Sequence, residues 1–151
     1  MLGNAQRRAN AGHYDDAVAR LYSAIEKCAK IALQTRHGID NSNIRMEQMP
    51  QSLREEWRTI ANDESMVRVG LEKSFQLLAA LNDPMGEIFL ARQKALKDTL
   101  QARNASLLAH GYVPIDSDKY EKLLAVALDF LQVDKKSLPT FPHLDWKALL
   151  P

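Results

Sequence analysis

The sequence contains very little cysteine: Cys28 stands alone among 151 residues. One cysteine cannot form an internal disulfide, which excludes a disulfide-stabilised secreted scaffold and makes a reducing cytoplasm the expected location. Because Cys28 lies on the apolar face of a helical pattern, we expect it to be a thiol of the hydrophobic core. The sequence also lacks an apolar run long enough to cross a bilayer, and its first residues are not a basic-then-apolar leader. We therefore expect no membrane association.

Charge of one sign is not in excess either. Lysine and arginine number 20 against 19 acidic residues, and a formal net charge of +1 argues against a strongly basic, non-specific nucleic-acid binder. The 4 histidines are scattered, and no two have the spacing of a metal site on one helix. A glycine-rich phosphate loop and a Gly-x-Ser-x-Gly nucleophile motif are both missing. These absences weigh against metal, nucleoside-triphosphate and acyl-transfer chemistry, and we expect no cofactor.

Apolar residues at helical spacing are what the sequence has in abundance. The clearest pattern runs from Asp15 to about Arg36, with two acidic residues in its first turn, and Gly38 ends it. No stretch alternates apolar and polar residues with period two over a useful length. The sequence therefore predicts one all-α domain, a bundle of four main helices with additional short helices and an extended C-terminal tail. The predicted helices span residues 2–11, 15–36, 52–61, 67–81, 84–110 and 117–131.

Turn and cap signals set the boundaries of these helices. Residues 38–51 are predicted to form a polar connection, after which Ser52 and Glu55 have the spacing of a capping box. Asp83 and Pro84 predict an N-cap followed by the first position of a helix. The last helix is predicted to be capped by Asp116 or Ser117, and the tail over residues 133–151 to be anchored by Phe141, Leu144 and Trp146.

The longest predicted helix ends in two polar residues that interrupt its apolar stripe. His110, Arg103, Leu96 and Phe89 lie seven residues apart, which is nearly two helical turns, and therefore on one face. Burying an arginine and a histidine there costs free energy unless a partner compensates. Two alternatives follow. Arg103 forms a purely structural ion bridge, for which Glu26 on the early long helix is a candidate, or both residues face a cleft.

Arg103 and His110, with Asn104 beside them, suit attack on a phosphodiester. A guanidinium is a planar fork of donors that matches phosphate oxygens and keeps its charge near neutral pH. An imidazole accepts or donates a proton at working pH, and the last turn of a helix favours its charged form. A base or acid near the 2′-hydroxyl and a cation near the phosphorane are most of what a metal-free ribonuclease needs.

Arg103-Asn104 followed by Ala105 to Ala109 and His110 resembles the R-x4–6-H motif of the HEPN superfamily, including the polar residue usual after the arginine. The stretches YDDAVARLYSAIE (14–26) and NASLLAHGYVPI (104–115) resemble the HEPN half of CRISPR-associated effectors that join a CARF sensor to a HEPN nuclease. The resemblance covers nearly the whole chain. No Rossmann-like alternation of strands and helices is present, so we expect residues 1–151 to be a single HEPN domain without the CARF sensor. Cyclic oligoadenylate would then act only through that absent domain.

This resemblance implies a homodimer in which the Arg/His sets of both protomers line one composite cleft. The implied reaction is metal-independent cleavage of single-stranded RNA in antiviral defence, leaving a 2′,3′-cyclic phosphate and a 5′-hydroxyl. Arg103 would stabilise the phosphate charge, His110 would act as acid or base, and Asn104 would position RNA or the histidine. The alternative is a non-catalytic helical module for dimerisation or protein binding. Residues that would support the site or contact RNA are Tyr112, Ser106, Arg20, Glu26, Arg92, Lys94 and Lys97.

Overall fold

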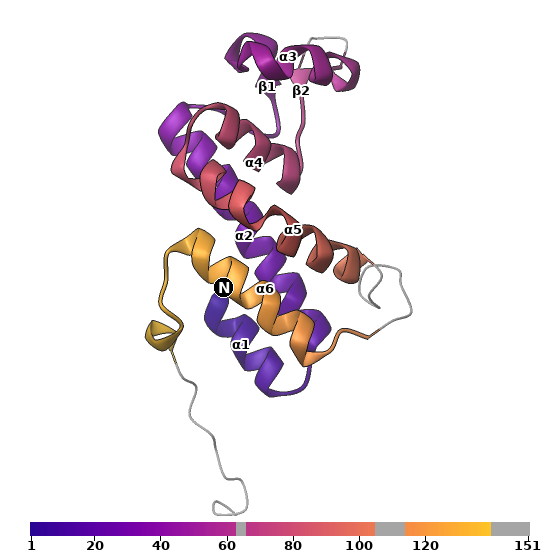
Figure 1. The fold of residues 1–151 in the computed structure, drawn as a ribbon, viewed down its shortest axis with the longest axis vertical. Coiled ribbons are helices and arrows are strands. Elements are labelled where there is room, and N and C mark those ends of the chain that lie inside the picture. Colours follow the sequence, from indigo (N-terminus) through magenta and orange to yellow (C-terminus); the bar gives the residue numbers. More distant parts are fainter. Residues whose placement is uncertain (63–65, 105–113, 140–151) are drawn as a thin grey trace, which may run out of the picture.

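The computed structural model describes residues 1–62, 66–104 and 114–139, without the side chains of residues 99, 102 and 103. These residues form six α-helices and one pair of very short strands (Figure 1). The predicted all-α class is confirmed. In chain order the elements are α1 (Leu2–Asn10), α2 (Tyr14–His37), β1 (Ile44–Arg45), η1 (Met46–Gln48), α3 (Gln51–Trp57), η2 (Arg58–Ile60), β2 (Met66–Val67), α4 (Leu71–Ala80), α5 (Pro84–Asn104), α6 (Ser117–Leu131) and η4 (Lys135–Ser137).

Helix α2 runs through the centre of the molecule, and α1, α4, α5 and α6 all pack against it (Figure 1). Its apolar face is buried along its whole length, as the helical spacing predicts. The helix ends where Gly38 adopts a left-handed conformation, with φ of 65°. Cys28 is buried on this face, and burial raises the pKa of its thiol. The buried residues of α2 are Ala17, Val18, Leu21, Ala24, Ile25, Cys28, Ala29, Ala32 and Leu33.

Helices α4 and α5 form a close antiparallel pair. Asp83 caps α5 as predicted, because its Oδ1 accepts the backbone N–H of Met85 at 2.9 Å. Gly86 allows the two helices to touch: a Cβ at this position would lie 2.2 Å from the Cα of Ala79. The ring of Phe75 stacks on that of Phe89, with centroids 5.5 Å apart, and so joins α4 to α5 in the core.

Two local predictions between α2 and α4 are wrong. Residues 38–51 are not only a polar connection, since Ile44 in β1 pairs antiparallel with Val67 in β2. Val67 is therefore a strand residue, and α4 begins only at Leu71. Strands of two residues are too short to produce a detectable alternation. Together with α3, they form the part at the top of Figure 1, far from α1 and α6.

The predicted capping box in the same region is also wrong. Pro50, not Ser52, is the N-cap of α3, and its side chain makes no capping hydrogen bond. Ser52 lies inside the first turn. The short helix is held instead by Trp57, which is fully buried, and by Arg54, whose Nε donates to the carbonyl of Met49 at 2.9 Å. A proline at the boundary fixes φ near its helical value without any side-chain acceptor.

The last helix, α6, begins as predicted: Oδ1 of Asp116 accepts the backbone N–H of Lys119 at 2.9 Å. Leu131 is half-buried, and the buried residues of α6 are Tyr120, Leu123, Leu124, Val126, Ala127 and Phe130. Beyond it, η4 leads to Leu138, which packs on the core. The predicted anchors Phe141, Leu144 and Trp146 lie outside the described residues. Within the described ranges, no helix has the length and apolarity needed to span a membrane.

Candidate functional site

The helix that carries the Arg/His motif is α5. Phe89 and Leu96 on its predicted stripe are both about 1% exposed, and Met85 and Leu100 pack against the same core. The stripe is therefore the buried face of α5 up to Leu100. The backbone of position 103 continues this helix with the same register, although the side chain is not described.

Only part of the motif falls on described residues. Asn104 is the last residue of α5, and its side chain is exposed. Ser106, His110 and Tyr112 lie outside the described residues. The end of the helix at His110 and the approach of that histidine to Arg103 therefore stay predictions.

Ile115 comes just after the segment that carries His110, here called the motif segment, and it contacts the first turn of α2. The backbone N–H of Ile115, a buried residue, donates to Oδ2 of Asp15 at 3.3 Å. This contact joins residues 100 positions apart, and it fixes where α6 starts relative to α2. The contact thus joins one residue from each of the two sequence stretches that carry the family resemblance, 14–26 and 104–115.

Arg20 lies one turn beyond Asp16 on α2 and is part of an ion-pair cluster. Its Nε donates to Oδ1 of Asp16, one turn earlier, at 2.9 Å, and Nε of Arg8 in α1 donates to the other carboxylate oxygen. Desolvation would raise the pKa of Asp16, but the hydrogen bonds and charges of Arg20 and Arg8 outweigh it and lower the pKa. Asp16 therefore joins α2 to α1 through its pair with Arg8, and Arg20 pairs with the same carboxylate within α2.

Glu26, the other candidate on α2, is half-buried at the edge of a surface hollow. This hollow has a volume of about 530 Å³, and its lining also includes Lys30, Asn41 and Arg68. Because the side chain of Arg103 is not described, a Glu26–Arg103 bridge stays a prediction.

A second hollow lies between α5 and α6, with a volume of about 580 Å³. It brings together two of the three cations singled out on α5, Arg92 and Lys94, but not the third. Nζ of Lys97 instead lies 3.0 Å from Oε1 of Glu72 on α4. The lining of this hollow between α5 and α6 consists of Ala91, Arg92, Lys94, Ala95, Asp98, Lys119 and Lys122.

Lys119 and Lys122 were missed by sequence reasoning. Nothing in the order of residues relates the start of α6 to the middle of α5. That Lys119 and Lys122 lie near the cations of α5 can be recognised only when the two helices are known to pack together. Among the described residues, no three histidine, cysteine or acidic side chains are grouped so that they could hold a metal ion.

Comparison with known families decides the assignment. The sequence matches the family model described as the Csm6 HEPN domain over residues 1–134. The chain belongs to this family. Membership places it among CRISPR-associated HEPN ribonucleases and agrees with its helical architecture. The match to the HEPN model contains both Arg103 and His110 and stops before most of the tail. No significant match was found among curated proteins or solved structures.

Proposed function

We propose that this HEPN domain is a metal-independent endoribonuclease that cleaves single-stranded RNA in CRISPR-linked defence. Arg103 and His110 are the proposed catalytic residues, and Asn104 is a proposed positioning residue. Membership of the Csm6 HEPN family is the observation that carries the proposal, because the matched residues 1–134 include the whole Arg/His motif. The metal independence rests on the chemistry of the two side chains, which supply a proton carrier and a permanent cation.

The proposed reaction is attack of a ribose 2′-oxygen on the adjacent phosphorus. A bond forms between the 2′-oxygen and phosphorus while the bond from phosphorus to the 5′-oxygen breaks. The proton of the 2′-hydroxyl leaves to a base, and the 5′-oxygen takes a proton from an acid, so that a 2′,3′-cyclic phosphate and a 5′-hydroxyl result. His110 fills one of these roles, and Arg103 stabilises the negative charge on the non-bridging oxygens.

The proposed site is composite and lies between two protomers. The stripe of α5 is buried within one bundle at Phe89 and Leu96, whereas its continuation in the sequence carries Arg103 and His110. A cation in a dry core is costly, but a cation in a cleft that an RNA phosphate enters is compensated. A cleft between two copies would place two Arg/His sets around one phosphodiester.

The test is cleavage of a labelled single-stranded RNA in EDTA by the wild type, Arg103→Ala and His110→Ala. Each substitution should reduce the cleavage rate by about 100-fold or more, the usual cost of losing a proton carrier or a charge-stabilising group. His13→Ala is the matched control, because His13 is an exposed histidine whose side chain makes no capping bond. It should cleave like the wild type.

Two outcomes would contradict the assignment. Undiminished cleavage by His110→Ala would remove the histidine from the reaction. Cleavage of an RNA whose 2′-hydroxyls are all methylated would exclude attack by the 2′-oxygen.

A further inference from the structure

We propose that the hollow between α5 and α6, here called the α5–α6 groove, binds the sugar–phosphate backbone of single-stranded RNA. The groove is defined by Ala91, Arg92, Lys94, Ala95, Asp98, Lys119 and Lys122. The identity of the polymer rests on the proposed function. The groove would guide the strand toward the motif segment, so it is a binding site and its residues take no part in the chemistry.

The charge of the groove is the first argument. Four of its lining residues are cations and only Asp98 is an anion. Among the residues that the structure describes, neither Lys94 nor Lys122 forms a salt bridge within 4.0 Å, although the charge of Lys122 attracts Asp116 at a longer distance. Since the chain as a whole has a formal charge of only +1, the excess of positive charge in the groove does not result from a generally basic protein. Unpaired lysines that flank a hollow are suited to neutralise phosphates with release of counterions.

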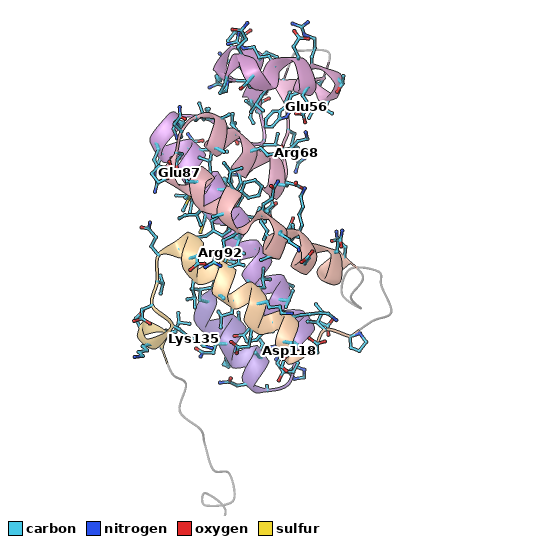
Figure 2. The ribbon with its side chains drawn as sticks, viewed as in Figure 1. Glu56, Arg68, Glu87, Arg92, Asp118 and Lys135 are labelled. Atoms are coloured by element: carbon cyan, nitrogen blue, oxygen red, sulfur yellow. The ribbon has the colours of Figure 1, made fainter. Side chains whose placement is uncertain are left out.

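The other two cations are held in place by carboxylates of α6 and its cap. The guanidinium of Arg92 lies 2.6 Å from Oδ2 of Asp129, and Nζ of Lys119 lies 3.3 Å from Oδ2 of Asp116. Figure 2 shows Arg92 beside α6. Neither carboxylate belongs to the lining of the groove. These pairs fix the positions of two donors at the edge of the groove, while Lys94 and Lys122 keep their charge for a ligand.

The shape of the groove is the second argument. Ala91 and Ala95 lie one turn apart on α5, and their small side chains leave room between the two helices. Lysine side chains on both helices are long enough to rest their alkyl stems on this floor with the ammonium groups in water. A volume of about 580 Å³ bordered by cations is large enough for a stretch of polymer rather than a single ion.

The position of the groove is the third argument. α5 and α6 are the helices that the motif segment joins, and the end of α5 and the start of α6 lie on the same side of the molecule (Figure 1). Lys119 stands in the first turn of α6. Arg92 and Arg103 are eleven residues apart, which is about three turns or roughly 16 Å along one face of α5. A strand in the groove can therefore continue toward the motif.

The test measures binding without cleavage. A fluorescently labelled single-stranded RNA with fully methylated 2′-oxygens is titrated with the full chain, and its anisotropy is followed at several salt concentrations. Lys94→Ala combined with Lys122→Ala should weaken binding by about tenfold near physiological salt. The magnitude of the slope of log Kobs against log salt should fall by about 1.4, at about 0.7 per lost phosphate contact on a single strand.

Lys135→Ala is the matched control, because it removes an exposed lysine outside the groove, where Glu121 pairs with it. It should bind like the wild type, and all three proteins should melt at similar temperatures since these lysines are exposed. An unchanged affinity and salt slope in the double variant would overturn the proposal. So would an acidic peptide that binds the groove more tightly than the RNA at the same salt.

The outcome is separable from that of the proposed nuclease. If the wild type does not cleave RNA but the double variant loses affinity, RNA binding by the groove is supported and the proposed nuclease activity is not. If the wild type cleaves RNA and the double variant keeps both its affinity and its KM, the nuclease activity is supported and RNA binding by the groove is contradicted. Loss of the groove alone should raise KM with little change in kcat, because a backbone contact away from the reacting atoms stabilises ground and transition states equally.

Discussion

The guanidinium of Arg36 lies 2.9 Å from Oδ1 of Asp83, and the carboxylate of Asp83 is only 2% exposed. The same carboxylate caps α5 and also lies 3.0 Å from Nε2 of His37. One side chain therefore joins the C-terminal end of α2 to the N-terminal end of the helix that carries the motif. The direction of α5, and with it the position of Arg103, depends on this contact.

Replacing Asp83 by alanine should lower the free energy of unfolding by about 1.5 kcal/mol. The N-cap contributes about 1 kcal/mol, and the ion pair with the half-exposed Arg36 contributes less than that. Urea unfolding at neutral pH measures the change. Glu55→Ala is the control, because Glu55 forms only a long, exposed pair with Arg58 at 3.9 Å and should change stability by less than about 0.5 kcal/mol. Equal costs at both positions would contradict the role of Asp83.

Asp83 should also make stability depend on pH. Desolvation raises its pKa, but the hydrogen bonds from Met85, His37 and Arg36 outweigh it and lower the pKa below the ordinary 3.8. A depressed pKa means that the folded protein holds the proton less tightly than the unfolded chain. The contribution of Asp83 is therefore complete above about pH 5 and is lost as pH falls toward and below its folded pKa.

The measurement is the free energy of unfolding of the wild type and of Asp83→Asn at several pH values between neutral and about pH 3. The wild type should lose stability faster on acidification than the variant, which has no proton to bind at this position. Parallel curves would show that Asp83 is not a source of the acid sensitivity. Asp16, whose pKa is also lowered, should make both curves fall, and so it does not affect the difference.

Gly86→Ala should destabilise the fold by about 2 kcal/mol, although alanine is the better helix former. The added Cβ would meet the Cα and N of Ala79 at 2.2 and 2.3 Å, and these are backbone atoms that cannot rotate away. Thermal unfolding followed by circular dichroism measures the effect. Gly70→Ala serves as the control, since nothing lies within 4 Å of its Cβ position and its φ is −84°. A stabilised Gly86→Ala variant would show that α4 and α5 are farther apart.

Cys28 should react with a thiol reagent only when the chain unfolds. The side chain is about 9% exposed, and burial raises the pKa of its thiol, so that little nucleophilic thiolate is present near pH 8. Labelling with a disulfide reagent should be slow in buffer and complete within the dead time in concentrated urea. Rapid labelling of the native protein would place Cys28 at the surface.

The sequence could predict those features that depend on neighbours along the chain. The apolar spacing and Gly38 define α2, and Asp83 followed by Pro84 defines the start of α5. Contacts between distant positions were not predictable: Arg36 and Asp83 are 47 residues apart, and Lys122 reaches the groove only because α6 packs on α5. The error at Ser52 has a different cause, since a capping-box spacing is common and Pro50 already supplies the helix start.

The proposed composite site predicts that cleavage depends on protein concentration. If each site needs two protomers, the rate per protomer should rise with concentration and level off where light scattering shows that the dimer is complete. Mass action gives this dependence because a protomer without its partner has half of the proposed Arg/His constellation. The control is the binding of methylated RNA to the α5–α6 groove, which lies within one chain and should require no second copy. A rate per protomer that stays constant while light scattering reports only monomers would place the whole reaction within one chain.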